Sequence, residues 1–336
     1  MLHHASAPNT RITMDKPVTI ASRRSPLAVA QAEAVRAMLG EASGLAQEAL
    51  EEAFPIKTYV TTGDINMAGS LSDVGGKGLF VKEVEMALLT GEADIAVHSM
   101  KDMPAVMPEG LVQTAVPERE DPRDAFVTLD GRAIDDLEEG AVIGTSSVRR
   151  KAQLLRRRPD LRIVPFRGNV ATRLQKLANK EAEGTFLAEA GLRRLGRTDV
   201  KRSPQPIEAM LPALGQGALC IQCREDDETS LALGAKITHI ESELATWVER
   251  AFVAQLDGSC RTPMAGIAIV RDDDIIFRAE ILMPEGDASE AIERAITLGS
   301  GERNAKIRAA FEHGKALGEE ILHAASPKLR HVLTGV

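Results

Sequence analysis

The sequence is poor in aromatic residues and in cysteine, and it contains no long apolar run. Aromatic side chains make up only 3% of the 336 residues, so aliphatic side chains must fill the interior. Three cysteines are too few, and odd in number, for a disulfide framework, which favours a reducing compartment. No apolar run approaches the roughly 20 residues of a membrane span, and no signal-peptide pattern opens the chain. These absences predict a cytoplasmic protein.

Basic residues are concentrated in one part of an acidic chain. The net charge of -8 argues against nucleic acid or an anionic membrane as a partner of the whole surface. Residues 149–176 nevertheless carry ten Lys or Arg and a single acid. Because guanidinium groups bind carboxylates and phosphates through paired donors, this segment predicts a local anion site. RNA binding is the alternative, but Phe166 is the only aromatic residue in the segment.

Strand and helix patterns alternate through the first two thirds of the chain. Helical periodicity follows polar caps, and Ser25-Pro26 and Thr145-Ser146-Ser147 are good helix starts. This alternation predicts two α/β halves with mostly parallel sheets around a cleft. From about residue 242 the pattern changes to that of a smaller α+β domain. The predicted strands are the short apolar runs at 18–21, 56–61, 93–97, 141–143 and 163–166.

Two arginines stand where cations are locally unfavourable. Arg149 and Arg150 fall in the first turn of a predicted helix, where free N–H groups and the dipole favour an anion. An anionic ligand would offset that conflict. Arg23 and Arg24 follow a strand of the first half in the same way. The two halves could then hold one polyanion, although surface charge is the alternative reading of such pairs.

Two further residues, Asp102 and Cys260, are candidates for a catalytic or covalent role. Asp102, next to Lys101, follows an apolar strand at the edge where α/β sheets bind ligands. It could serve as a general acid or base or stabilise a cation, and capping the turn before Pro104 is an equally weighted alternative. Cys260 stands in a loop of small residues beside Arg261, which would favour the thiolate, although an inert loop cysteine is common.

Three residues that could bind ligands are assigned to structure instead. His98 lies at a strand edge and is predicted to be a hydrogen-bonded structural histidine. Cys220 and Cys223 have the spacing of a metal or redox pair, but no second pair accompanies them, so they are predicted to be buried strand cysteines. The loop at 75–78 lacks the spacing of a nucleotide-binding motif. The sequence therefore predicts neither a metal nor a nucleotide.

Ten segments, in this order, resemble the hydroxymethylbilane synthase family, also called porphobilinogen deaminase. Any one could arise by chance, but ten in register are specific. They are SRRSPL at 22–27, VGGKGLFVK at 74–82, DIAVHSMKDMP at 94–104, EREDPRDAF at 118–126, GTSSVRR at 144–150, RRPDL at 157–161, RGNVATR at 167–173, AGLRRLG at 190–196, GQGA at 215–218 and the Cys260 loop.

The resemblance implies a three-domain fold. Two α/β domains, like those of type II periplasmic binding proteins, lie around a cleft, and a smaller C-terminal α+β domain carries the Cys260 loop. The implied boundaries are a loose leader at 1–16, domain 1 at 17–117 and 216–238, domain 2 at 118–215, and domain 3 at 239–336.

The resemblance also implies an activity. Four porphobilinogen molecules would be deaminated and joined head to tail on a covalent dipyrromethane cofactor, and the linear tetrapyrrole would be released by hydrolysis. Asp102 would be catalytic and Cys260 would hold the cofactor through a thioether. The remaining implied site residues are Lys101, Ser147, Arg149, Arg150, Arg173 and Gly191 for the cofactor, and Arg23, Ser25, Lys77, Arg167 and Arg194 for the substrate.

The resemblance further implies a cytoplasmic monomer that uses no metal and passes its product to uroporphyrinogen-III synthase. The alternative is a non-enzymatic two-domain anion-binding protein, because fold does not fix function. Such a protein would need neither Asp102 nor Cys260. Two residues depart from the family pattern: Ser259 replaces a usual glycine, and Glu189 stands where the family has a small residue in an aliphatic strand. We expect the charge of Glu189 to perturb Arg194.

Overall fold

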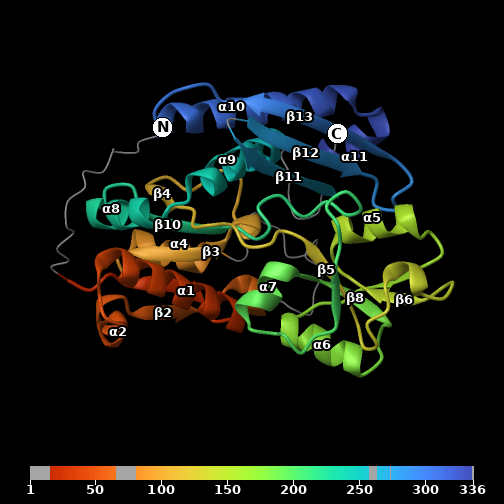
Figure 1. Cartoon of the computed structure of the whole chain (residues 1–336), viewed down its shortest axis with the longest axis horizontal. Coiled ribbons are helices and arrows are strands. Elements are labelled where there is room, and N and C mark those ends of the chain that lie inside the picture. Colours follow the sequence, from red (N-terminus) through yellow and green to blue (C-terminus); the bar gives the residue numbers. More distant parts are fainter. Residues whose placement is uncertain (1–15, 66–80, 257–262, 273, 335–336) are drawn as a thin grey trace. The chain divides into compact units, whose positions relative to one another are not determined.

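The computed structural model describes residues 16–65, 81–256, 263–272 and 274–334 (Figure 1). The chain divides into two compact units. Unit 1 is Met1–Arg119, Ala218–Glu243 and Glu302–Asn304, and unit 2 is Glu120–Gly217, Leu244–Gly301 and Ala305–Val336. The chain therefore enters unit 2 at Glu120 and returns to unit 1 at Ala218. The division into three domains stays a prediction.

Unit 1 is built on a five-stranded sheet with the order β2-β1-β3-β10-β4. β1 is parallel to β2 and β3, whereas β10 is antiparallel to β3 and β4. Four strands thus share one direction, and the reversed strand, β10, is the one that follows the return at Ala218. The strands are β1 (Ile20–Arg23), β2 (Ile56–Tyr59), β3 (Ile95–Ser99), β4 (Leu111–Ala115) and β10 (Leu219–Arg224).

Helices cover both faces of this sheet. Val35 of α1 (Pro26–Ser43) and Leu233 of α8 (Glu228–Ile237) pack with Ile20 on one face. Val84 of α4 (Lys82–Leu89) packs with Ala21 on the other face. Successive strand residues point to opposite faces, so the apolar pair Ile20-Ala21 of β1 buries one side chain under each layer of helices. Short helices α2 (Leu50–Ala53) and α3 (Thr62–Ile65) flank β2.

Unit 2 contains a second five-stranded sheet with the equivalent order β7-β6-β8-β5-β9. β6 is parallel to β7 and β8, and β5 is the reversed strand. β5 is the first strand after the chain enters unit 2, as β10 is after its return. The two similar α/β halves predicted from the sequence are confirmed. The strands are β5 (Asp124–Thr128), β6 (Val142–Gly144), β7 (Arg162–Val164), β8 (Gly184–Ala188) and β9 (Arg202–Pro204).

Three helices cover the second sheet. Leu154 of α5 (Val148–Arg157) packs with Phe126 and Phe186 on one face. Leu177 of α6 (Val170–Ala178) and Leu192 of α7 (Glu189–Arg194) pack with Ala125 and Leu187 on the other. Neighbouring residues of β5 thus bury their side chains in different cores.

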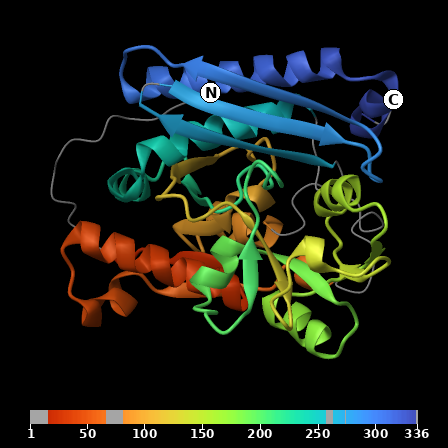
Figure 2. The same cartoon turned by 45° about the vertical axis from the view of Figure 1, so that its right-hand side comes forward.

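The C-terminal part of unit 2 is an antiparallel sheet, β11 (Met264–Arg271), β12 (Asp274–Leu282) and β13 (Ser289–Thr297), packed against helices (Figure 2). The helices are α9 (Ile240–Gln255), α10 (Arg303–Ala324) and α11 (Pro327–Thr334). A Cβ atom at Gly314 of α10 would overlap the Val248 carbonyl oxygen of α9, so glycine lets the two backbones approach closely. The predicted α+β architecture of this part is confirmed.

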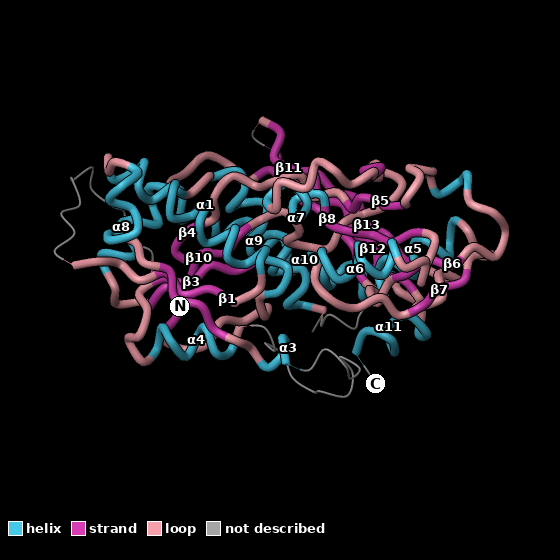
Figure 3. The backbone as a smooth tube through the Cα atoms, turned by 90° about the horizontal axis from the view of Figure 1, so that it is seen from below, coloured by secondary structure: helices cyan, strands magenta, loops and turns pink. Residues whose placement is uncertain are grey.

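The turn between β12 and β13 holds helix α5, which lies beside β12 (Figure 3). Arg156 of α5 donates to Glu280 of β12 at 2.5 Å (Nη1 to Oε2). Gly286 in the turn has φ of +75°, and a Cβ atom there would overlap the Ala152 carbonyl oxygen of α5. This close approach fixes the helix whose first turn carries two of the predicted site residues.

Replacing Gly286 with alanine tests that contact. We expect Gly286→Ala to lower the free energy of unfolding by about 1–3 kcal/mol more than Gly299→Ala does, because overpacking adds to left-handed backbone strain. Gly299 is the matched control, since its φ is +72° and no atom lies within 4 Å of the point that a Cβ atom would occupy. Urea unfolding of both variants measures the difference. Equal losses would contradict the close packing of the turn on α5.

Candidate functional site

Polar side chains gather at the carboxyl ends of β1 and β3 in unit 1. Asp102 ends the 3-10 turn η2 (Met100–Asp102) directly after β3, and its side chain is 33% exposed. Arg23, the last residue of β1, lies 4.0 Å from it (Nη1 to Oδ2). The Arg23 guanidinium also forms an ion pair with Asp64. Because β1 and β3 are parallel neighbours, their ends bring a catalytic candidate and a cation together.

Two other predicted residues of unit 1 lie close by in the chain. Ser25 caps helix α1, because its Oγ accepts a hydrogen bond from the Ala28 N–H at 3.3 Å. This confirms the predicted helix start at Ser25-Pro26. Lys101, next to Asp102 in η2, is half-buried. Lys77 lies outside the described residues.

A buried polar layer lies beneath this end of the sheet. His98 of β3 is 4% exposed, and its Nε2 has no hydrogen-bond partner among the residues that the structure describes. Burial lowers the pKa of His98 to about 4, and the side chain of Gln222 raises that pKa by a smaller amount. Gln222 of β10 donates to Glu85 of α4 at 3.1 Å, and burial raises the pKa of Glu85. The imidazole is therefore neutral at physiological pH.

The lowered pKa of His98 predicts an acid-sensitive contribution to stability. Below its ordinary pKa of 6.5 the unfolded histidine binds a proton that the folded one binds only near pH 4. Stability is therefore complete above pH 6.5 and falls as the pH drops towards 4, by about 3 kcal/mol in total. We expect the free energy of unfolding in urea to differ less between pH 7 and pH 5 in His98→Gln than in the unmodified protein.

Exposed His313 provides the control for this experiment. His313→Gln should keep the pH dependence of the unmodified protein. A wild-type slope in His98→Gln would show that the imidazole does not cause the effect.

In unit 2 a buried carboxylate holds two arginines together. Asp124, the first residue of β5, is fully buried. Its Oδ2 accepts from Arg149 at 2.6 Å, and its Oδ1 accepts from Arg150 at 2.7 Å and from the Gln216 side chain at 2.9 Å. Burial alone would raise the pKa of Asp124, but Arg149 and Arg150 outweigh it and hold that pKa far below its usual range. Asp124 thus stays ionised.

Asp124 supplies part of the negative charge that a ligand was expected to bring. Arg149 and Arg150 do lie in the first turn of α5, as predicted, with Ser147 as N-cap. Their first counter-charge, however, is an acid 25 residues away, which sequence reasoning missed. The available signal was an acid opening an otherwise apolar strand. One carboxylate between two guanidiniums still leaves a positive charge for a ligand.

Two more arginines of unit 2 donate hydrogen bonds to backbone carbonyls, and the charge of Glu120 also acts on one of them, Arg194. Arg173 of α6 donates to the Gly168 carbonyl at 2.9 Å, and Arg194 of α7 donates to the Gly217 carbonyl at 2.7 Å. Neither forms an ion pair with a carboxylate in the described ranges. Burial lowers the pKa of both, and for Arg173, where Arg150 adds repulsion, the pKa is about 10. Partly buried guanidiniums of this kind favour an anionic ligand.

The remaining predicted residues of unit 2 occupy loops and a helix. Arg167 follows β7 and is half-buried, and Gly191 is buried in α7. Cys260 lies outside the described residues. Cys220 and Cys223 are buried in β10, as predicted, and burial raises the pKa of Cys223 to about 12.

Two kinds of feature are missing from the described part of the chain. It contains no cluster of three His, Cys, Asp or Glu side chains placed to hold a metal ion. None of its helices is both long and apolar enough to cross a membrane.

Removing the charge of Asp124 tests the arginine pair. We expect Asp124→Asn to lower the free energy of unfolding by about 3–5 kcal/mol, because two buried guanidiniums lose their counter-charge. Asp130→Asn is the control, since Asp130 is 52% exposed and paired with Arg132, and it should cost about 1 kcal/mol or less. Urea unfolding at pH 7 compares them. Similar losses in both variants would contradict the proposed cost of the unpaired arginines.

Comparison with known proteins identifies two matching family models. Residues 18–232 match the model described as "Porphobilinogen deaminase, dipyromethane cofactor binding domain", and residues 244–323 match "Porphobilinogen deaminase, C-terminal domain". A curated protein of Paracoccus denitrificans (strain Pd 1222), described as porphobilinogen deaminase, is 51% identical over 278 residues, which cover 83% of this chain and 88% of the relative.

Solved structures of binding proteins are similar to this chain only at a distance. Substrate-binding domain 2 of Lactococcus lactis GlnP is 12% identical with a TM-score of 0.40 and covers 68% of this chain and 91% of its own. A periplasmic binding protein of an arginine transport system from Legionella pneumophila is 14% identical with a TM-score of 0.37, with coverage of 66% and 93%. These likenesses are too distant to indicate a ligand. The predicted α/β fold class, with two similar five-stranded sheets and a smaller C-terminal part, is confirmed by the strand orders above and by the match to a C-terminal family model.

Proposed function

Since the chain belongs to the porphobilinogen deaminase family, we propose that the two sets of residues described above act on porphobilinogen and on the pyrrole chain made from it. The enzyme is a transferase, hydroxymethylbilane synthase, with a covalent dipyrromethane cofactor. Four porphobilinogen molecules lose ammonia and are joined head to tail on that cofactor, and hydrolysis releases the linear tetrapyrrole. The non-enzymatic anion-binding alternative is not favoured, because cofactor-binding and C-terminal models both match.

The surplus of positive charge in unit 2 is the observation that carries the residue assignments. Asp124 forms ion pairs with Arg149 and Arg150, and Arg150 lies close enough to Arg173 to lower its pKa. Glu280, whose charge also acts on Arg149, is itself paired with Arg156. Each porphobilinogen unit carries an acetate and a propionate group. Two positive charges in excess fit such a dicarboxylate, and paired guanidinium donors match the planar carboxylate. The residues present therefore fit the carboxylates of the cofactor.

Further residues near these arginines are proposed to bind the cofactor or the substrate. Ser147 caps the helix that carries Arg150, and Gly191 lies on the helix that carries Arg194. With Lys101, we assign them to the cofactor. Arg194 and Arg167, together with Arg23, Ser25 and Lys77, are assigned to substrate carboxylates. When bound, the dipyrromethane would supply the free pyrrole carbon to which the first unit of the chain is joined.

Asp102 is proposed to stabilise positive charge during the reaction. Loss of ammonia breaks the carbon–nitrogen bond of the aminomethyl group and leaves a cation spread over the methylene carbon and the ring. A partly exposed carboxylate beside the pyrrole N–H stabilises such a cation and can hold the proton that the pyrrole carbon later releases. Arg23, with its guanidinium 4.0 Å away, can orient that carboxylate.

Further assignments rest on the family alone. We propose that Cys260 forms the thioether to the cofactor and that the chain folds as the three domains given above. We also propose that the enzyme is a cytoplasmic monomer whose product is used by uroporphyrinogen-III synthase.

The attachment of the cofactor is tested by intact-mass spectrometry. We expect the purified protein to exceed its sequence mass by one dipyrromethane and to give the colour reaction of pyrroles with an acidic aldehyde reagent. Cys260→Ser should lack both and form no tetrapyrrole. An unmodified wild-type protein that still produces tetrapyrrole would overturn the attachment site.

The same measurement separates attachment from catalysis. Asp102→Asn should keep the added mass but lose turnover by roughly 100-fold or more. Asp130→Asn, which changes an exposed acid in the same way, should keep both. Unchanged turnover in Asp102→Asn would contradict the catalytic role of that carboxylate.

A further inference from the structure

Glu189 is the acid that departs from the family pattern, and it lies outside the expected strand. β8 ends at Ala188, and Glu189 is the first residue of helix α7, where an acid interacts favourably with the helix dipole. Its backbone N–H donates to the Arg123 carbonyl at 3.0 Å. Its side chain is only 2% exposed. The departure from the family thus places a charged group inside unit 2.

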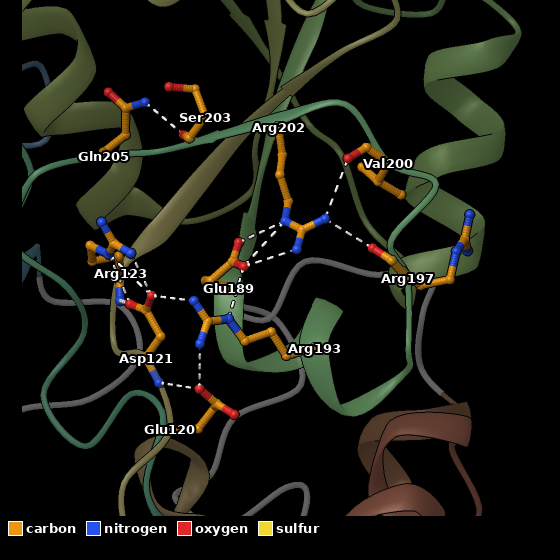
Figure 4. Close-up of polar contacts among 10 residues, drawn as sticks. All are labelled: Glu120, Asp121, Arg123, Glu189, Arg193, Arg197, Val200, Arg202, Ser203 and Gln205. Atoms are coloured by element: carbon orange, nitrogen blue, oxygen red, sulfur yellow. Dashed lines mark hydrogen bonds and ion pairs between the residues drawn. The ribbon is translucent and has the colours of Figure 1, made fainter.

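Two arginines share the buried carboxylate of Glu189 (Figure 4). Arg202 of β9 donates to it through Nε at 2.9 Å and Nη2 at 3.0 Å. Arg193, one turn along α7, donates through Nε at 3.1 Å. Burial alone would raise the pKa of Glu189, but the hydrogen bonds from Arg202 and Arg193 outweigh it and lower that pKa. The group is an ionised carboxylate that ties α7 to β9.

Arg193 extends the network to the segment by which the chain enters unit 2. Its Nη1 lies 3.1 Å from Glu120 and its Nη2 lies 3.0 Å from Asp121. Asp121 is held in turn by Arg123 at 2.7 Å. Acids and arginines balance in this network, which comprises Glu120, Asp121, Glu189, Arg123, Arg193 and Arg202 (Figure 4).

The residue after Arg193 is Arg194, which reaches the other connecting segment. Its Nη2 donates to the carbonyl of Gly217, the last residue before the chain returns to unit 1. Side chains of successive helical residues point about 100° apart, so the orientation of the short helix sets both directions at once. Fixing Arg193 therefore fixes where Arg194 can point.

We propose that Glu189 is a positioning residue for Arg194, and this inference rests on the proposed function of Arg194. By holding Arg202 and Arg193, Glu189 fixes α7 in the orientation that presents the Arg194 guanidinium to the carboxylates of porphobilinogen. An uncharged residue at position 189 leaves Arg202 and Arg193 without the ionised carboxylate that they share, so α7 is less firmly held.

The variant Glu189→Gln keeps the shape of the side chain and removes its charge. We expect KM for porphobilinogen to rise roughly 5- to 20-fold while kcat changes less than twofold, because carboxylate binding is weakened and the reacting groups are untouched. Asp199→Asn is the matched control. Asp199 is an exposed acid paired with Arg197 on the same open groove as Glu189, and its variant should keep the wild-type KM. An unchanged KM in Glu189→Gln would overturn the proposal.

A double-mutant cycle distinguishes positioning from a general effect on stability. Arg194→Gln should itself raise KM, and adding Glu189→Gln to it should cause no further rise, because the second residue acts through the first. Multiplying effects on KM would overturn the positioning role and leave the assignment of Arg194 standing. An unchanged KM in Arg194→Gln would instead overturn the assignment of Arg194, and the positioning role with it.

A second variant keeps the proposal testable if Glu189→Gln does not fold. Arg193 is 46% exposed, so Arg193→Gln should fold and should raise KM in the same direction by a smaller factor. A wild-type KM for that variant would count against the network.

Discussion

Burying charge is the constraint on which unit 2 depends. A carboxylate taken out of water is tolerated only when opposite charges and hydrogen bonds replace its hydration. Asp124 and Glu189 are both nearly or fully buried, and each is bonded to two arginines. The chain segment that enters unit 2 serves both groups, because Glu120 and Asp121 bind Arg193 while Asp124 binds Arg149 and Arg150. Its row of acids thus orders arginines of helices α5 and α7.

The segment by which the chain leaves unit 2, residues 215–217, packs against the entering segment through Gln216 and Gly217. Gln216 donates to the Pro122 carbonyl at 2.7 Å and to Asp124, so it joins the two connecting segments. Gly217 has φ of +88°, and a Cβ atom there would overlap the Glu120 carbonyl oxygen. The Gly215 N–H donates to buried Glu249 of α9 at 2.5 Å. The GQGA segment, recognised first as part of a family pattern, therefore has a packing role that only glycine at 217 can fill.

Local features of the fold could be predicted from the sequence, and distant pairings could not. Ser25 and Ser147 mark helix starts because a cap acts within three residues. The reversal of β5 and β10 depends on strand neighbours brought together across the whole chain, which periodicity does not encode. The pairing of Asp124 with Arg149 could not be predicted for the same reason, because the two residues are 25 positions apart in the chain. Glu189 was misplaced in a strand because the apolar run before it gives no sign of where the strand ends.

The arginines of unit 2 consequently fall into two physical classes. Arg149 and Arg150 are bound to an ionised carboxylate of the protein, so they keep their geometry whether or not a ligand is present, and their ordering is already part of the folded state. Arg173 and Arg194 are bound to neutral carbonyls, which hold a guanidinium less strongly than a carboxylate does. A carboxylate can therefore replace those carbonyls as the acceptor. Under the assignments proposed above, Arg149 and Arg150 would hold carboxylates of the bound cofactor in a fixed geometry, whereas Arg194 would exchange its carbonyl for a carboxylate of the arriving substrate.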